Sequence, residues 1–323
     1  MVDVLQSLGN HRGFWIMLSS RVLSKTIFLG FILAFTGLSG PAHADWRKEL
    51  GRFRIGVAAP RITEMNPTEI GRLKSIYAAA LDMPVELVVL PDIPALIDAQ
   101  ATERIDYTIE TSAAYAAAYT ACECVEPLVA PIGADRSLGI RSILLLRTNV
   151  DGKDLKSARI ALPADAAKAA AFIPVSTYML SGTNADLVHD TFTNAGSLEK
   201  AEKLFTSGKI DGFFGWVPAS GEELQRHGGT LARLTEQGLD RNSYRIAWES
   251  SLLRYGPHAV RANLAPEAKL ILRQFLVSLS TRDPDAYDLI DPVHGGGFVA
   301  VGSNDYRLPL KMLSAIIGQG KEL

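Results

Sequence analysis

The run His294-Gly295-Gly296-Gly297-Phe298 has residue types that could take part in catalysis. A glycine-rich loop after a histidine can offer backbone N–H groups to an oxyanion, as in the oxyanion holes of some esterases. There the loop precedes a G-x-S-x-G nucleophile, whereas only residues 299–323 follow here and none forms that motif. We therefore interpret the run as a glycine turn that enters the apolar segment 298–301.

Other motifs of catalysis and metal binding are missing from the sequence after residue 44. It contains no G-x-x-x-x-G-K-[ST], H-E-x-x-H, C-x-x-C or G-x-S-x-G pattern, and its histidines are not clustered at metal-ligand spacing. The sequence therefore predicts no catalytic residues, no metal and no cofactor.

Residues that could bind a small ligand follow several predicted strands, where open α/β sheets hold their ligands. A strand over 54–58 precedes Arg61, and a strand over 105–109 precedes a helix that begins near residue 112. Two aromatic candidates could equally be core residues, and two basic candidates could be solvated charges. The predicted ligand-binding residues are Arg61, Thr111, Ser112, Tyr115, Lys168 and Trp216.

The elements that must position these residues alternate between apolar strands and amphipathic helices, which predicts an α/β fold with largely parallel sheets. One helix opens at Asn66-Pro67-Thr68-Glu69, with proline in its first turn. Further strands are expected at 85–90, 142–147, 159–162, 210–216 and 245–248. Further helices are expected at 94–102, 112–120, 166–180, 198–207, 220–227 and 266–280, and after residue 305.

An internal echo indicates two lobes of similar design. The segments 96–107 and 201–212 each read as a helix, then a basic residue, then Ile-Asp at the start of a strand. Asp106 and Asp211 are interpreted as structural residues at these strand starts. The predicted lobes are 45–148 together with 249–323, and 149–248.

Residues 1–44 have the pattern of a secretory signal peptide, possibly with an upstream extension because Met17 could be the start. Arg21 and Lys25 precede the apolar run 27–38, and the small-residue site Ala42-His43-Ala44 follows. The run is shorter than the roughly 20 residues that span a bilayer. Cleavage after Ala44 and export to the periplasm are predicted.

The net charge of the chain argues against nucleic-acid binding, and its two cysteines leave two alternatives open. Residues 1–44 carry three basic residues and one acidic one, so the net charge of −2 becomes −4 without them. A mildly acidic chain lacks the basic patches of nucleic-acid-binding proteins. Cys122 and Cys124 could form a C-x-C bridge in an oxidising compartment or remain two thiols.

Several segments together resemble the phosphonate and phosphite binding-protein family of ABC importers, of which the chain would be a divergent member. They include Arg54 to Ala58, 95–99 with Arg104-Ile105-Asp106, 111–115, 139–147 before Asp154-Leu155-Lys156, 208–211, and 297–299 before Asp305-Tyr306. The resemblance implies a two-lobed type II periplasmic binding protein fold with a ligand cleft between the lobes. It also implies a monomer that closes on a small anionic ligand and delivers it to an inner-membrane ABC permease.

The likeness is incomplete at the ligand site of that family. Its Ser-Thr-Ser-Gly run aligns with Ala167-Lys168-Ala169-Ala170, its Gly-Ser-His with Gly196-Ser197-Leu198, and its Tyr before the strand at 142 with Ile140-Arg141. Because the segment Ala167-Lys168-Ala169 lacks the hydroxyl donors of the family's serine and threonine run, we expect phosphonates such as aminoethylphosphonate to bind weakly. A ligand-sensing module for a membrane receptor and a secreted enzyme on the same scaffold remain alternatives.

Overall fold

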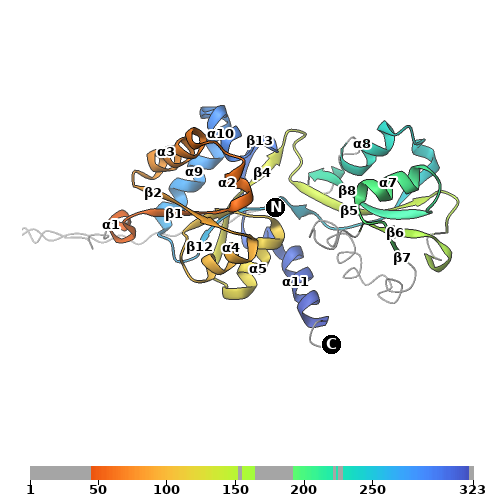
Figure 1. The fold of residues 1–323 in the computed structure, drawn as a ribbon, viewed down its shortest axis with the longest axis horizontal. Coiled ribbons are helices and arrows are strands. Elements are labelled where there is room, and N and C mark those ends of the chain that lie inside the picture. Colours follow the sequence, from red (N-terminus) through yellow and green to blue (C-terminus); the bar gives the residue numbers. More distant parts are fainter. Residues whose placement is uncertain (1–44, 152–154, 164–191, 221–222, 225–227, 320–323) are drawn as a thin grey trace, which may run out of the picture. The chain divides into compact units, whose positions relative to one another are not determined.

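The computed structural model describes residues 45–151, 155–163, 192–220, 223–224 and 228–319, which form two mixed β-sheets flanked by helices (Figure 1). The first sheet has the order β13-β4-β12-β3-β1-β2. Its strands are β1 (Phe53–Ala58), β2 (Val85–Leu90), β3 (Tyr107–Ile109), β4 (Val125–Gly133), β12 (His258–Arg261) and β13 (Gly295–Ala300). Strand β1 runs parallel to β2 and β3, whereas β12 and β13 pair antiparallel.

The second sheet has the order β10-β5-β8-β6-β7, with two short strands beside it. Its strands are β5 (Gly139–Arg147), β6 (Ile160–Leu162), β7 (Phe192–Asn194), β8 (Gly212–Ser220) and β10 (Tyr244–Glu249). The short strands β9 (Glu223–Leu224) and β11 (Leu253–Arg254) pair with β8 and β5. Two 3-10 turns, η1 (Leu155–Ser157) and η3 (Arg241–Ser243), precede β6 and β10. The chain thus enters the second sheet through β5 and returns to the first sheet at β12.

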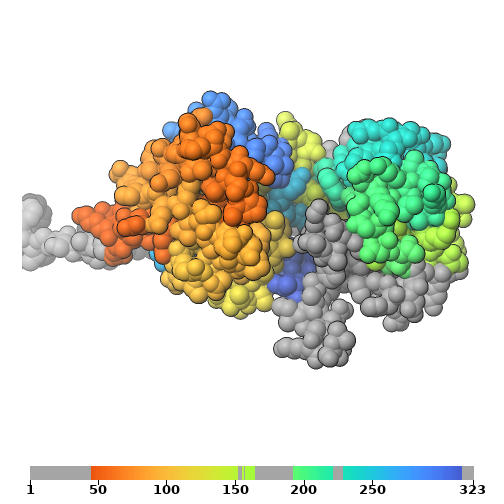
Figure 2. All heavy atoms as spheres, in the orientation of Figure 1, coloured from red at the N-terminus to blue at the C-terminus, as the bar shows by residue number. Residues whose placement is uncertain are grey.

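Helices cover both faces of the first sheet because its strands alternate side chains between two cores. Phe53, Ile55 and Val57 of β1 pack in one core with α3 (Pro67–Leu81), α9 (Pro266–Arg282) and α10 (Pro284–Ile290). On the opposite face, α4 (Ile93–Ala101) lies against α5 (Ser112–Cys122), which also contacts α11 (Arg307–Gln319). The part of the chain around the first sheet also contains three short elements: α1 (Trp46–Leu50), α2 (Ala59–Thr63) and η4 (Ser303–Tyr306). In Figure 2 the orange atoms of α2, α3 and α4 lie on the surface that is turned to the viewer.

Close packing on the α4 face explains why β1 carries a glycine. A Cβ atom on Gly56 would lie 2.4 Å from a methyl carbon of Ile105 and 2.9 Å from one of Leu96. These contacts are too short for any real side chain. Glycine therefore lets β1 approach the second core.

Local sequence signals explain several helix boundaries. Helix α3 begins with a capping box, in which the Asn66 side chain accepts from the backbone N–H groups of Thr68 and Glu69, and Glu69 accepts from Asn66. This confirms the predicted start. Of the described residues, no helix is both long and apolar enough to cross a bilayer.

The internal echo is a structural repeat in register. Helices α4 and α7 (Leu198–Thr206) have N-caps at Asp92 and Ser197, 105 positions apart. At their C-terminal ends Glu103 and Gly208, also 105 apart, both have positive φ, 53° and 75°. The same helix-to-strand connection therefore occurs in both parts of the chain.

Some predicted elements differ from the structure. The helix expected at 220–227 is wrong where it is described, because Glu223 and Leu224 form β9 and pair antiparallel with Ser220 and Ala219. The next helix among the described residues is α8 (Gly229–Glu236). The sheets are mixed rather than largely parallel, since strands that cross from one sheet to the other enter antiparallel. The helix expected at 166–180 lies outside the described residues. Strands β4 and β12 and helix α10 were not predicted.

Cys122 and Cys124 form a disulfide at the end of α5. Glu123 between them has a left-handed backbone, which ends the helix and reverses the chain. Of the two alternatives that the sequence left open, the structure contains the bridge.

Candidate functional site

A cavity of about 550 Å³ lies at the C-terminal ends of β1 and β3, the edge where the sequence predicted a site. Three of the predicted residues, Arg61, Thr111 and Ser112, line it together. The remaining wall comes from the start of β5, from β11 and the segment that leads into β12, and from the end of α10 with the loop before β13. Its principal lining residues there are Ile140, Leu253, Arg254, Tyr255, His258, Ile290, Asp291, Val293 and His294.

Arg61 is held at this cavity by the short helix α2, which directly follows β1. Its guanidinium donates to the carbonyl oxygen of Ile290, at the end of α10. Its positive charge lowers the pKa of His258, so the guanidinium lies near that ring. Arg61 is therefore a positioned cation within the site.

The first turn of α5 also faces the cavity, through Thr111, Ser112 and Ala113. Thr111 caps the helix by accepting from the N–H of Ala114 at 3.1 Å. The Ser112 hydroxyl donates to the carbonyl oxygen of Arg254. A helix start of this kind favours an anion, because its free N–H groups carry partial positive charge.

Arg254 and Gly256 bring the returning chain against α5. A Cβ atom on Gly256 would lie 1.8 Å from the carbonyl oxygen of Glu110, so only glycine allows this approach. The buried Nε of Arg254 has no hydrogen-bond partner among the described residues. The site thus contains a second arginine with donor capacity to spare.

Beneath the cavity lies a buried chain of polar rings. The Tyr77 hydroxyl is 2.7 Å from that of Tyr107, which is 2.5 Å from Nδ1 of His258. Burial, together with the nearby positive charge of Arg61, lowers the pKa of His258 to about 3. His258 is therefore a neutral imidazole at physiological pH.

Asp291 organises the loop on the other side of the cavity. Its Oδ1 is 2.8 Å from Nδ1 of His294 and accepts from the N–H groups of Val293 and His294, and Tyr287 donates to Oδ2. Burial alone would raise the pKa of Asp291, but the interactions with His294 and the backbone lower it. The His294 ring packs against Tyr255 with centroids 4.4 Å apart. Asp291 is consequently a structural anion whose bonds are satisfied locally.

Glu110 also lies beside the cavity, and its carboxyl group is buried in the protein. It is 6% exposed, and neither carboxyl oxygen has a well-aligned hydrogen bond with a described residue. Burial raises the pKa of Glu110 to about 8, although the nearby Gln100 side chain opposes this. Glu110 is therefore mainly uncharged at pH 7.

The structure places two other predicted site residues, Tyr115 and Trp216, away from this cavity. Tyr115 is fully buried, and its ring packs against Tyr306 with centroids 4.9 Å apart, one turn beyond the start of α5. Trp216 lies within β8, where the centre of its ring is 5.2 Å from the Arg233 guanidinium carbon and its backbone N–H donates to the Thr230 hydroxyl oxygen. Lys168 lies outside the described residues.

Sequence reasoning missed Arg254, Tyr255, His258 and Asp291. No strand was expected at 258–261, so no sheet edge was predicted near these residues. His294 was noticed in its glycine run, and the structure places that run as the start of β13, with positive φ at Gly295 and Gly297. The spacing of Asp291 and His294 is the one signal that could have indicated a structured turn.

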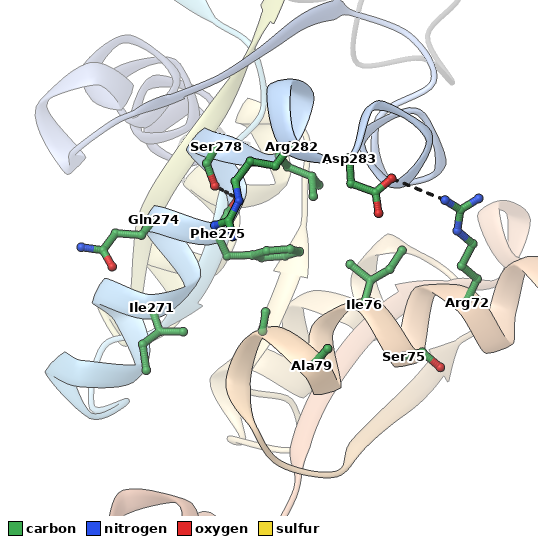
Figure 3. Close-up of a pocket in the computed structure, with 12 residues that line it drawn as sticks. Arg72, Ser75, Ile76, Ala79, Ile271, Gln274, Phe275, Ser278, Arg282 and Asp283 are labelled. Carbon is green, nitrogen blue, oxygen red and sulfur yellow. Dashed lines mark hydrogen bonds and ion pairs between the residues drawn. The ribbon is translucent and has the colours of Figure 1, made fainter.

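A larger cavity of about 720 Å³ lies between α3 and α9, but it lacks features of a ligand site (Figure 3). Ile76, Phe275 and Ile271 point toward it, and Arg72 is paired with Asp283 at 3.5 Å. It lies between two helices and away from the strand ends.

Groups of three or more potential metal ligands are absent from the described residues.

Comparisons with solved structures show a shared fold. XAC2383 from Xanthomonas citri matches in its ATP-bound form (TM-score 0.54, 12% identity, 82% of this chain and 96% of that one). Its chloride-bound form matches similarly (TM-score 0.54, 13% identity, 84% and 100%). The shared fold rests on these two matches, and PhnD1 from Prochlorococcus marinus with methylphosphonate gives a lower TM-score (0.48, 14% identity, 82% and 98%). No curated protein sequence matches the chain.

The family to which the chain belongs is shown by a family model rather than by these distantly related structures. It describes the periplasmic substrate-binding protein of phosphonate ABC transporters and matches residues 68–306. That range contains both sheets' central strands and most of the cavity. The chain therefore belongs to the phosphonate ABC transporter family of periplasmic substrate-binding proteins, and it has their two-lobed α/β fold.

Proposed function

We propose that this protein binds a small oxyanion at the cavity beside α5 and delivers it to the permease of an ABC importer. The observation that carries the proposal is the convergence of Arg61, Arg254 and the first turn of α5 on one cavity. Two guanidinium groups and a helix start together favour a negative ligand. Family membership supports a binding and delivery role.

The lobes in this proposal are residues 45–148 with 249–323, and 149–248. Pairing of β12 and β13 with β4 supports assigning the C-terminal residues to the first lobe. Trp216 and Lys168 are proposed to belong to the ligand surface of the second lobe. A ligand that contacts both lobes when they are closed would favour that state, and the permease would recognise it.

The proposal includes a monomeric protein without catalytic activity, exported to the periplasm with cleavage after Ala44. Neither Asp291 nor His258 is placed to act as a catalytic acid or base at the described cavity. The carboxylate of Asp291 is bonded to its own loop, and His258 is buried and neutral.

Calorimetry with phosphate, methylphosphonate and methanesulfonate tests the anion site. We expect Arg61→Ala and Arg254→Ala each to weaken binding at least tenfold, since each removes a charge that contacts the ligand. Arg104→Ala is the matched control, because Arg104 is an exposed arginine paired with Asp98 on the surface. Equal affinity in all variants, or binding of no anion, would contradict the proposal.

A further inference from the structure

The lining of the cavity beside α5 indicates which chemical group the ligand carries in addition to its anionic group. This inference rests on the proposed function. Much of the wall is hydrocarbon. Ile109, Ala113 and Pro131 contribute from the first sheet and α5, and Ile140 and Leu253 from the paired strands β5 and β11. A small inorganic anion needs no such surface, because apolar walls do not contact it favourably.

Val293 extends this apolar surface to the rim. Val293 is 80% exposed as a residue, the highest value of the exposed large hydrophobic residues described. Its position is fixed, since its N–H is bonded to Asp291 at 3.3 Å. A hydrocarbon group bound in the cavity would remove part of this side chain from water.

Acidic groups that could bind an ammonium group are scarce at the same cavity. Asp291 uses its oxygens for His294, the backbone and Tyr287, and the carboxyl group of Glu110 is buried away from solvent. Glu64 also lines the cavity but is exposed to water. An amino group bound here would lose its hydration without a buried carboxylate to replace it.

We propose that the site selects an oxyanion whose other end is an uncharged hydrocarbon group, as in alkyl or aryl phosphonates and sulfonates. The arginines and the start of α5 hold the charged end. The hydrocarbon end lies against the walls formed by Ile109, Ile140, Leu253 and Val293. Inorganic phosphate and amino-substituted anions bind more weakly than alkyl anions of equal head group.

Two matched ligand series test this selection by calorimetry. Along methyl-, propyl- and hexylphosphonate, affinity should rise about fourfold for each methylene group that the cavity buries. Propylphosphonate and aminoethylphosphonate have chains of the same length, so the latter should bind at least tenfold more weakly. The inference is overturned if aminoethylphosphonate or inorganic phosphate binds as tightly as propylphosphonate. If no anion binds at all, the proposed function itself has failed.

Substitutions at the rim provide a second test that does not disturb folding. Val293→Thr keeps the shape of the side chain and adds a hydroxyl, at a position that already faces water. It should weaken hexylphosphonate binding several-fold and leave methylphosphonate unchanged. Val89→Thr, at an exposed valine of β2, is the control and should alter neither ligand. A Val293 variant that affects both ligands equally, or neither, contradicts the proposed placement of the hydrocarbon chain.

Discussion

Asp106 binds Arg54 in the same arrangement with which Asp211 binds Arg159, 105 positions later. Each aspartate accepts from the backbone N–H and Nε of its arginine through one oxygen and from Nη2 through the other, at 2.7–3.0 Å. The two pairs differ in burial, because Arg261 adds an ion pair at 3.0 Å to Asp106 alone. The side chain of Asp106 is 0% exposed and that of Asp211 is 21% exposed.

This difference in burial predicts unequal losses of stability from one substitution. Asp106→Asn should lower the free energy of unfolding by about 3–5 kcal/mol, because two arginines lose a buried partner. Asp211→Asn should cost about 1 kcal/mol, as expected for a partly solvated pair. Urea unfolding monitored by circular dichroism measures both. Equal losses would show that burial does not set the strength of these pairs.

The neutral state of His258 predicts a pH dependence of stability. The pKa of His258 is about 3 in the folded protein, so the unfolded chain binds the extra proton between about pH 6.5 and 3. The free energy of unfolding should therefore fall as the pH decreases through this range. His258 contributes up to about 1.4 kcal/mol per pH unit.

The variant His258→Gln isolates this contribution. It retains a polar side chain beside Tyr107 and Arg61 but cannot take up the proton. Its unfolding free energy should have a shallower slope than that of the wild type between pH 6 and 4, measured by urea titration at each pH. Parallel curves for the two proteins would mean that His258 is not the responsible group.

Tyr115 should behave as a core residue in spite of its place beside the predicted site. Replacing it by alanine should cost about 3–5 kcal/mol of stability, because it leaves a cavity next to Tyr306. Anion affinity of the folded fraction should remain unchanged, in contrast to that of Arg61→Ala. Thermal melts with and without the anion separate these effects. Reduced affinity with an unchanged melting temperature would show instead that Tyr115 contacts the ligand.

Cleavage of the leader predicts a mature chain that begins at Asp45. Asp45 caps α1 by accepting from the N–H of Arg47 at 3.2 Å, and Trp46 is buried, so the folded region can begin directly at the proposed cleavage site. N-terminal sequencing of protein from the periplasmic fraction should read Asp-Trp-Arg. Full-length protein in the cytoplasmic fraction would contradict the prediction.

Much of the fold could be inferred from local patterns. The capping box at Asn66, the strand at 85–90 and the ends of α7 were placed within a residue or two, because capping and periodicity depend on near neighbours in the chain. The repeat at Asp106 and Asp211 was also visible, since it preserves residue types at a constant spacing. Three lining residues followed from the rule that ligands bind at strand ends.

The remainder of the site depends on contacts between distant segments. Whether Tyr115 faces ligand or core is decided by Tyr306, and the walls of the cavity are completed by the returning chain at Arg254 and His258 and by the loop at Asp291. His258 is brought beside Tyr107 by strand pairing across 151 residues. Sequence patterns indicate which helix or strand each segment forms. Which side chains are buried, and which residues they contact, is set by the packing of helices and strands against one another. The chain's strands and helix starts could therefore be read in advance, but the charge, depth and hydrocarbon character of the cavity required the folded structure.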